Sequence, residues 1–273
     1  MSTFSIVIPC YNEASRIPLD RLSSFLLTNA EAHIIFVNDG STDETFQKLT
    51  AFISQYPDKC DIVSHEERKG KASAVQSGML RALHDTKAQY IGYLDADFST
   101  DPEEFFLLYL YAQSHQLDYI FGSRIKKLNA VIKRNNFRHY AGRFIATLTD
   151  GWFKLGIYDT QCGAKCFKRE IVSTLFEKPF KTKWLFDIEI FIRIKQSETT
   201  FSGYEYPLQN WINARGSKIN LKRKFKVKPI TTIVVLLLSL VGFTANTQTK
   251  NLSTVDEAIN IALQNNQSIK ASD

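Results

Sequence analysis

The chain has 273 residues, a length that fits one large domain or two small ones. Hydrophobic residues make up 44% of it, which is enough for a full core and excludes wholesale disorder. The formal net charge of +6 favours an anionic partner, although charge alone does not choose among a nucleotide, a phospholipid surface and a nucleic acid. Part of this charge is local, because Lys and Arg crowd into residues 218–228.

The first 125 residues alternate between strand-like and helix-like segments. In chain order, strands are expected at 3–9, 33–38, 61–64, 90–94 and 119–122, and helices at 18–30, 43–55, 70–84 and 102–115. Ser41 or Thr42 is a candidate N-cap for the second helix, and Thr100 or Asp101 for the fourth. Such alternation predicts an α/β fold with a mostly parallel, doubly wound sheet.

Residues 130–155 carry apolar side chains at three- and four-residue steps, which predicts one long amphipathic helix. The apolar positions are Phe137, Tyr140, Phe144, Leu148 and Trp152. The helix either packs against the core or lies at a membrane interface beside a lipid acceptor.

Cysteine usage and the N-terminus both indicate a cytoplasmic protein. The four cysteines are Cys10, Cys60, Cys162 and Cys166, and no neighbouring Cys or His pair completes a zinc site. We therefore expect four reduced thiols. The N-terminal sequence has no basic segment followed by a long apolar run, so we expect no signal peptide.

Polar motifs follow the predicted strands at the points where ligands bind in open α/β sheets. Asp95 and Asp97 come directly after an apolar strand, and strand alternation puts both carboxylates on one side. Together they can bind a divalent cation that also holds a diphosphate. A helix-capping turn is the alternative, but it accounts for residues 100 and 101 and leaves the acids at 95 and 97 unexplained.

Three weaker motifs accompany this acidic pair. Asp39 can accept hydrogen bonds from a base or ribose, although a plain strand-to-helix turn explains its segment equally well. Pro9 ends the first strand, Tyr11 offers a stacking face and Glu13 an acceptor. Lys71 follows Gly70 at a helix start, which suits a diphosphate contact, with an exposed basic loop as the alternative.

In this order the motifs resemble glycosyltransferase family 2, over residues 4 to about 220. The resemblance implies a GT-A type nucleotide-diphospho-sugar transferase fold and a Mg²⁺ or Mn²⁺ cofactor. It also implies that Asp97 is the main metal ligand and that Asp95 and Lys71 help to hold the donor. The residues that would surround the nucleotide, usually uridine, are Pro9, Tyr11, Glu13 and Asp39.

Motifs in the second half of the chain resemble one subgroup of this family, the polyprenyl-phosphate glycosyltransferases. The segments that carry it are 122–124 (GSR), 158–170 (YDTQCGAKCFKRE), 184–190 (WLFDIEI) and 210–219 (NWINARGSKI). Asp-Thr-Gln-Cys-Gly resembles a marker of the dolichyl-phosphate β-glucosyltransferases, although Ala164 stands where that pattern has a bulky apolar residue. By this resemblance Arg124 and Arg138 grip the acceptor phosphate, Gln161 and Asp187 shape the pocket, and Lys218 reaches the diphosphate.

The expected reaction is transfer of a sugar, glucose from UDP-glucose by the resemblance, onto a polyprenyl phosphate with inversion at the anomeric carbon. A phosphate acceptor is already an anion near pH 7 and needs positioning more than deprotonation. Two alternatives stay open: a glycan or other hydroxyl acceptor, for which Asp187 would be the base, and an inactive nucleotide-binding module. No basic, aromatic-interleaved face predicts nucleic-acid binding.

The C-terminal segment differs in kind from residues 1–225, the predicted transferase domain. Residues 230–243 form an apolar run shorter than the roughly 20 residues that span a bilayer, and it follows a basic cluster, as in a signal peptide. Residues 252–273, with a short helix at 253–265, resemble the start of a mature outer-membrane efflux channel protein. We therefore expect residues 226–273 to derive from a neighbouring reading frame, with a membrane anchor as the alternative.

If residues 226–273 derive from a neighbouring reading frame, the transferase domain is truncated, because the family normally adds helices after the Gly-Ser-Lys motif at residues 216–218. A lipid-linked acceptor also implies a membrane surface as a partner. We therefore expect a peripheral protein at the cytoplasmic, inner face of the membrane.

Overall fold

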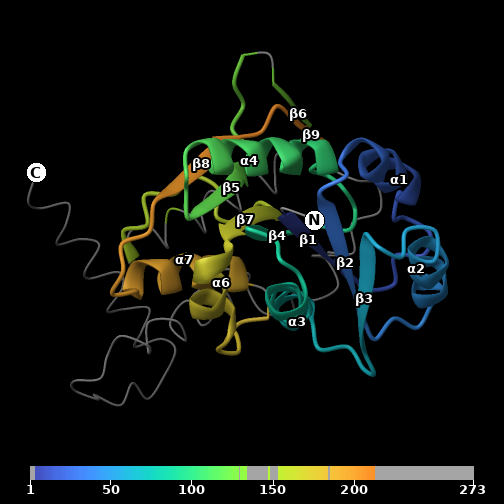
Figure 1. Cartoon of the computed structure of the whole chain (residues 1–273). Helices are drawn as coiled ribbons and strands as arrows, with labels where there is room; N and C mark the ends of the chain where they lie inside the picture. Colours follow the sequence, from blue (N-terminus) through green and yellow to red (C-terminus); the bar gives the residue numbers. More distant parts are fainter. Residues whose placement is uncertain (1–3, 129, 134–146, 148–152, 184, 213–273) are drawn as a thin grey trace, which may run out of the picture. The chain divides into compact units, whose positions relative to one another are not determined.

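The computed structural model describes residues 4–128, 130–133, 147, 153–183 and 185–212 (Figure 1). These residues form one seven-stranded sheet, in the order β3-β2-β1-β4-β7-β5-β8, and a two-stranded sheet of β6 and β9. The large sheet consists of β1 (Phe4–Cys10), β2 (Ala32–Asp39), β3 (Cys60–His65), β4 (Tyr90–Leu94), β5 (Tyr119–Ser123), β7 (Ala164–Lys168) and β8 (Gly203–Pro207). The small sheet consists of β6 (Val131–Lys133) and β9 (Asn210–Ile212).

Strand direction confirms the predicted mostly parallel sheet. Strands β3, β2, β1 and β4 pair in parallel, and so do β5 and β8. Strand β7 lies between β4 and β5 and is antiparallel to both. It therefore begins at the edge of the sheet where its two neighbours end.

Helices cover both faces of the large sheet, as expected of a doubly wound fold (Figure 1). One face packs against α1 (Leu19–Thr28), α2 (Thr45–Ile53) and α4 (Pro102–Ser114). The other packs against α3 (Lys71–Asp85), α6 (Arg169–Phe176) and α7 (Phe186–Gln196). Alternate residues of the central strands feed the two cores: Ile6 and Ile8 of β1 join the first, while Val7 joins the second.

The predicted elements between residues 3 and 122 are confirmed, with boundaries that differ by a few residues. Asp101 caps α4 as expected, because its Oδ1 accepts a hydrogen bond from the Glu103 amide at 3.1 Å. The cap expected for α2 is wrong. Ser41 and Thr42 bond to Asn12 instead, with Ser41 Oγ accepting from the Asn12 amide at 3.1 Å and the Thr42 amide donating to Asn12 Oδ1 at 2.8 Å. These side chains tie two loops together rather than capping a helix.

The long helix expected over residues 130–155 is wrong at its start. Val131–Lys133 is the strand β6, which pairs in parallel with β9 so that Ile132 lies opposite Trp211. The positions that carried the helical pattern lie outside the described residues, as does the predicted tail at 226–273. Within the described ranges, none of the helices is both long enough and apolar enough to span a bilayer.

All four cysteines are buried. Burial raises the pKa of Cys60 to about 12, and it also raises the pKa values of Cys162 and Cys166. The thiolate is the reactive form, so these thiols should be inert in the folded chain.

Ellman's reagent at about pH 8 should label no cysteine in the native protein and all four after unfolding in guanidinium. Fast labelling of the native chain would contradict this packing.

Candidate functional site

The acidic pair lies at the edge where β4 ends and β7 begins. Leu94, the last residue of β4, pairs with Ala164, the first residue of β7, and the Asp95 amide donates to the Gly163 carbonyl at 3.0 Å. This antiparallel step brings the loop 159–163, which carries the Asp-Thr-Gln-Cys-Gly motif, beside the Asp95 backbone. Two motifs about 65 positions apart in the sequence therefore share one site.

Lys71 and Asp95 form an ion pair with 2.6 Å between Nζ and Oδ1, at a position that is only partly open to solvent. Burial raises the pKa of Asp95, an effect that Lys71 opposes and Asp97 reinforces. For Lys71, burial alone would lower the pKa, but the carboxylates of Asp95, Asp187 and Asp97 outweigh it and raise the pKa above its ordinary value. The predicted donor-binding lysine therefore faces the predicted metal ligands.

A tight turn orients the second carboxylate. Asp97 Oδ1 accepts a hydrogen bond from the Ser99 amide at 3.0 Å, and the Phe98 amide donates to the Asp95 carbonyl at 3.1 Å. Phe98 has a φ of 43°, a left-handed conformation that a bulky residue rarely adopts, while its ring is only 2% exposed. The buried ring anchors the turn, so the strained backbone is held in place at the site.

The acidic pair fits a divalent cation that is shared with a diphosphate. Ions such as Mg²⁺ are commonly held by one or two carboxylates together with substrate phosphates. Among the described residues, no group of three or more His, Cys, Asp or Glu side chains could enclose a metal ion by itself. A Cβ at Gly163 would lie 2.1 Å from Asp95 Oδ2. The Asp95 carboxylate can therefore occupy its present position only because residue 163 is a glycine. Asp95 and Asp97 are therefore the described carboxylates that a cation shared with a diphosphate would fit, with its remaining ligands coming from the substrate.

Asp39 lies at the end of β2 and is 3% exposed. Its Oδ1 accepts hydrogen bonds from His65 Nδ1 and the Lys69 amide, both at 2.9 Å, and its Oδ2 accepts from the Gly70 amide at 2.8 Å. Gly70 has a φ of 100°, which glycine adopts readily, and α3 begins at the next residue. Asp39 therefore fixes the loop that leads into α3 and positions the start of that helix.

The other predicted nucleotide contacts lie at the end of β1. Pro9 is a β1 residue opposite Val37 of β2. The Arg68 guanidinium lies 4.2 Å from the centre of the Tyr11 ring. Glu13, which is 8% exposed, forms an ion pair with Arg16 at 2.6 Å. The structure therefore brings these residues to the same sheet edge as Asp39.

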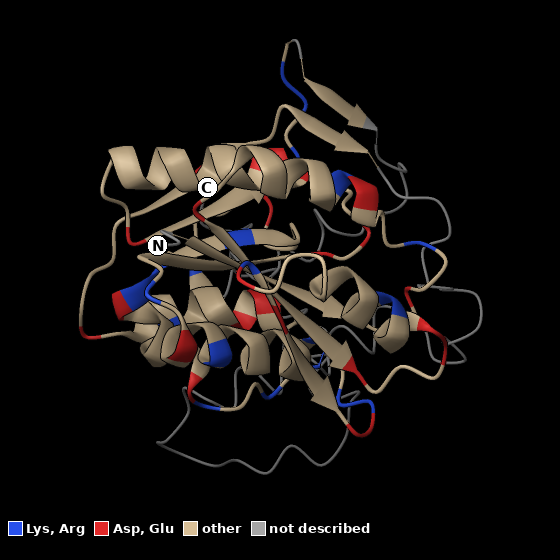
Figure 2. Ribbon diagram, turned by 45° about the vertical axis from the view of Figure 1, so that its right-hand side comes forward, with Lys and Arg blue, Asp and Glu red and all other residues tan. Residues whose placement is uncertain are grey.

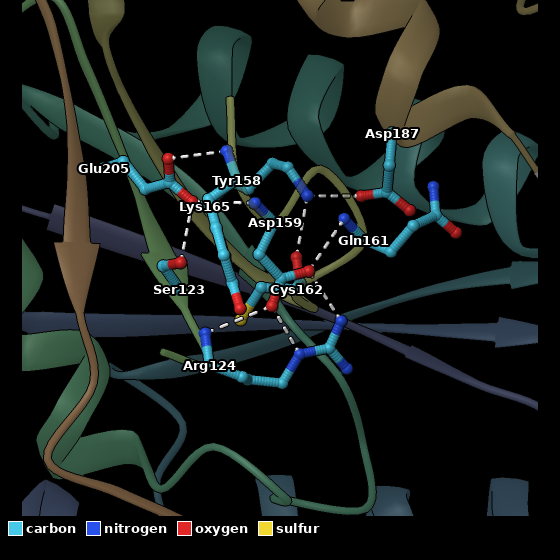
Figure 3. A network of polar contacts seen from close by, with 9 residues as sticks. All are labelled: Ser123, Arg124, Tyr158, Asp159, Gln161, Cys162, Lys165, Asp187 and Glu205. Carbon is cyan, nitrogen blue, oxygen red and sulfur yellow. Dashed lines mark hydrogen bonds and ion pairs between the residues drawn. The ribbon is translucent and has the colours of Figure 1, made fainter. Parts of the chain in front are cut away.

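A network of buried charges holds the loop 159–163 (Figure 3). Asp159 accepts hydrogen bonds from Nε and Nη2 of Arg124 at 2.6 and 2.7 Å. Burial alone would lower the pKa of Arg124, but the Asp159 carboxylate outweighs it and raises that pKa. Glu205 of β8 accepts from the backbone amides of Tyr158 and Asp159 at 2.9 and 2.7 Å and from Ser123 Oγ at 2.6 Å. Arg124 and the loop are therefore locked together.

Lys165 and Asp187 form a second buried pair in the same network (Figure 3). The Lys165 side chain is 0% exposed, and its Nζ donates to Asp187 Oδ1 at 2.6 Å and to the Cys162 carbonyl at 2.7 Å. Tyr93 donates its hydroxyl to the same Asp187 oxygen at 2.5 Å. Burial raises the pKa of Tyr93 well above its usual value, which keeps this donor protonated. Lys165 thus joins the first turn of α7 to the loop.

The structure brings together most of the predicted site residues. Gln161 belongs to the loop, and its Nε2 is buried without a hydrogen-bond partner, so it remains a candidate substrate contact. Arg138 and Lys218 lie outside the described residues. Four side chains that hold the others in place were not predicted from the sequence: His65, Asp159, Lys165 and Glu205. Asp159 and Lys165 stand within the motif segment 158–170, whereas no motif pointed to Glu205.

Comparisons with known proteins identify the family of this chain. The sequence profile described as Glycosyl transferase family 2 matches residues 5–176. A dolichyl-phosphate beta-glucosyltransferase of Trichomonas vaginalis is 30% identical over 236 residues, which cover 82% of this chain and 70% of the relative. The human dolichyl-phosphate beta-glucosyltransferase is 30% identical over 240 residues, covering 79% of this chain and 69% of the relative.

A solved structure has the same fold. Glucosyl-3-phosphoglycerate synthase from Mycobacterium tuberculosis, in complex with Mn²⁺, UDP and glucosyl-3-phosphoglycerate, gives a TM-score of 0.59 at 19% identity and covers 88% of this chain and 80% of its own. The mostly parallel sheet with its acidic pair beyond β4 thus defines a glycosyltransferase of the GT-A fold. The chain belongs to glycosyltransferase family 2.

The buried pair of Lys165 and Asp187 should be sensitive to loss of one partner. Lys165→Met leaves the Asp187 carboxylate buried without its cation and should lower the free energy of unfolding by about 3–5 kcal/mol. The double variant Lys165→Met/Asp187→Leu removes both charges and should recover most of that loss. Urea unfolding followed by circular dichroism measures both, with Lys87→Met at an exposed lysine as control. If Lys87→Met lowered the free energy of unfolding as much as Lys165→Met does, Lys165 and Asp187 would not form the expected buried pair.

Two glycines should respond differently to alanine because different atoms oppose the new Cβ. At residue 163 the obstacle is the end of the Asp95 side chain, which can move, so Gly163→Ala should fold with little loss of stability but displace that carboxylate. At residue 92 the obstacles include the Lys165 carbonyl at 2.3 Å and Cys166 Cα at 2.9 Å, so Gly92→Ala should unfold at clearly lower urea.

Transfer activity separates these two outcomes further. Gly163→Ala should lose most sugar transfer while its unfolding midpoint stays close to that of the unchanged chain. Full activity in Gly163→Ala would mean that the position of Asp95 is not needed for transfer.

Proposed function

We propose that this chain transfers glucose from UDP-glucose to a polyprenyl phosphate, with inversion at the anomeric carbon and with Mg²⁺ or Mn²⁺ as cofactor. The observation that carries the proposal is the meeting of Lys71 and Asp95 with the loop 159–163, which also holds Arg124. A cation-and-diphosphate site thus adjoins an arginine suited to a phosphate. The two dolichyl-phosphate beta-glucosyltransferases described above support this choice of substrates.

The donor side is built from the acidic pair and Lys71. Asp95 and Asp97 would hold the metal ion, which, when bound, neutralises charge on the leaving diphosphate. The mycobacterial synthase, which was solved with Mn²⁺ and UDP, supports this assignment. Lys71 would exchange its contact with Asp95 for one with the diphosphate. Tyr11, Glu13 and Asp39 would border the nucleotide, together with Pro9 at the end of β1.

The acceptor side is built around Arg124. Its guanidinium is held by Asp159 through two hydrogen bonds, so its orientation is set before the acceptor arrives. Arg138 would supply a second cation and Lys218 a further contact with the donor, and both residues lie outside the described part of the chain. A phosphate oxygen that attacks from the face opposite the departing diphosphate inverts the anomeric carbon. Gln161 would contact the sugar or the acceptor.

A hydroxyl acceptor suits this site less well than a phosphate. Such an acceptor needs a base, and Asp187 is the candidate. Its Oδ1 already accepts hydrogen bonds from Lys165 and Tyr93, so a substrate hydroxyl would compete with two buried donors for that oxygen. A phosphate acceptor avoids this competition because it arrives as an anion. Since a polyprenyl chain resides in a bilayer, the enzyme would work as a peripheral protein at the cytoplasmic, inner face of the membrane.

The proposed metal site can be tested with one matched pair of variants. Asp97→Asn removes a charged ligand and should lower the rate of glucose transfer by roughly 100-fold to 1,000-fold. Asp101→Asn changes a carboxylate four residues away and keeps the cap of α4, because asparagine caps as well as aspartate, so activity should be retained. The assay follows radiolabelled glucose from UDP-glucose into polyprenyl phosphate, with and without EDTA.

Two results would overturn metal-dependent transfer from UDP-glucose, and a third would overturn the proposed acceptor. One is an unchanged rate in excess EDTA, which would exclude the metal. The other is a failure of the purified chain to bind UDP-glucose in Mg²⁺ or Mn²⁺, which would favour an inactive module. Transfer to a glycan hydroxyl but not to polyprenyl phosphate would favour the alternative acceptor instead.

A further inference from the structure

The small sheet of β6 and β9, with the loop that leads into β6, stands away from the seven-stranded sheet (Figure 1, Figure 2). It exposes three large apolar side chains: Leu128 is 90% exposed, Ile212 54% and Val131 43%. Lys126 and Lys127 precede Leu128 and are also exposed. We call these five residues the ribbon patch. The ribbon patch thus combines three exposed apolar side chains with two cations.

Strand alternation places two apolar side chains of the ribbon patch on the outer side of the small sheet. In β6 and β9 the inward-facing residues are Ile132 and Trp211, which are 9% and 7% exposed. Their neighbours Val131 and Ile212 point away from that core, where a solvent-facing strand position is normally polar. The outer side of the small sheet therefore carries the apolar Val131 and Ile212 beside the polar Asn210, which lies opposite Val131.

The ribbon patch is connected to the reaction centre by short contacts. The Ile212 amide donates to the Ser99 carbonyl at 3.1 Å, and the Ser99 amide donates to Asp97 Oδ1 at 3.0 Å. The Arg124 guanidinium lies 5.3 Å from the centre of the Trp211 ring, on the strand that presents Ile212. A surface that engaged the ribbon patch would therefore lie close to both the acidic pair and Arg124.

We propose that the ribbon patch docks on the surface of an anionic lipid bilayer. Leu128, Val131 and Ile212 enter the headgroup region, and Lys126 and Lys127 pair with lipid phosphates. The Lys127 ammonium donates one hydrogen bond to the Pro207 carbonyl at the end of β8, at 3.3 Å, and its other N–H groups can donate to a lipid phosphate. The inference rests on the proposed function in one respect: a lipid-borne acceptor brings its phosphate to the bilayer surface, where Arg124 can reach it.

The pairing of charge and apolar area favours a bilayer as the occupant. Basic residues beside a few inserted apolar side chains are the usual composition of peripheral membrane contacts, because each contribution alone is weak. The lysines are attracted by anionic headgroups, and the apolar side chains require insertion. The two contributions can therefore be separated by changing either the protein or the lipid.

The test is sedimentation of the full chain with vesicles of phosphatidylcholine alone or mixed with phosphatidylglycerol. Leu128→Glu should weaken binding to the mixed vesicles by about tenfold or more, since it replaces an inserted leucine by an anion. Leu27→Glu is the matched control, because Leu27 is a 77% exposed leucine on α1. It should change vesicle affinity by less than about twofold.

A second variant changes the two lysines of the ribbon patch, so it does not depend on whether Leu128→Glu folds normally. Lys126→Ala/Lys127→Ala should lower affinity for phosphatidylglycerol vesicles by roughly tenfold and leave affinity for pure phosphatidylcholine unchanged. Both the leucine and the lysine variants should keep glucose transfer to a short, water-soluble prenyl phosphate, while losing transfer to a long polyprenyl phosphate embedded in vesicles. A merely structural role of the loop would lower both activities together.

The outcomes separate this inference from the proposed function. If Leu128→Glu binds vesicles as well as Leu27→Glu does, the ribbon patch is not a membrane contact. If Leu128→Glu instead abolishes self-association of the chain and leaves vesicle binding intact, the patch is a protein interface and the bilayer proposal is wrong. If the variants lose vesicle binding but the unchanged chain glucosylates no prenyl phosphate, the docking surface stands and the proposed acceptor is wrong.

Discussion

The antiparallel strand β7 is the constraint on which the rest of the site depends. Because it runs against β4 and β5, it starts where they end and delivers the loop 159–163 to the acidic pair. The Asp95 amide then bonds to the Gly163 carbonyl, and the missing Cβ at that glycine leaves room for the Asp95 carboxylate. A parallel strand in this position would begin at the opposite edge and leave the two motifs apart.

Around this junction each buried charge meets an opposite charge or a set of donors. Arg124 meets Asp159, Lys165 meets Asp187, and Asp39 accepts from a histidine and two amides. Such pairs cost desolvation and add little net stability, but they hold charges in defined places. Since Asp159 and the Cys162 carbonyl belong to one loop, Arg124 and the first turn of α7 are fixed to the same segment.

Local patterns predicted the helices and strands well where a segment's own periodicity decides its structure. They failed at Ser41 and Thr42, which look like a helix cap but bond to Asn12 about 30 positions earlier. They also failed at Val131–Lys133, where apolar spacing suggested a helix and pairing with β9 made a strand. In both cases the deciding partner is distant in sequence, and no local pattern contains it.

Strand length, alternation and turn residues are local properties. The alternating fold could therefore be predicted from the residues alone, and so could the position of the acidic pair, Lys71 and the Asp-Thr-Gln-Cys-Gly segment beyond strand ends. Which strand ends meet could not be predicted in this way, and neither could the pairing of Lys71 with Asp95 and of Lys165 with Asp187. The folded sheet also brings Glu205, which no motif marks, to the amides of Tyr158 and Asp159. Such contacts depend on strand order and direction, which are set by the packing of the whole sheet.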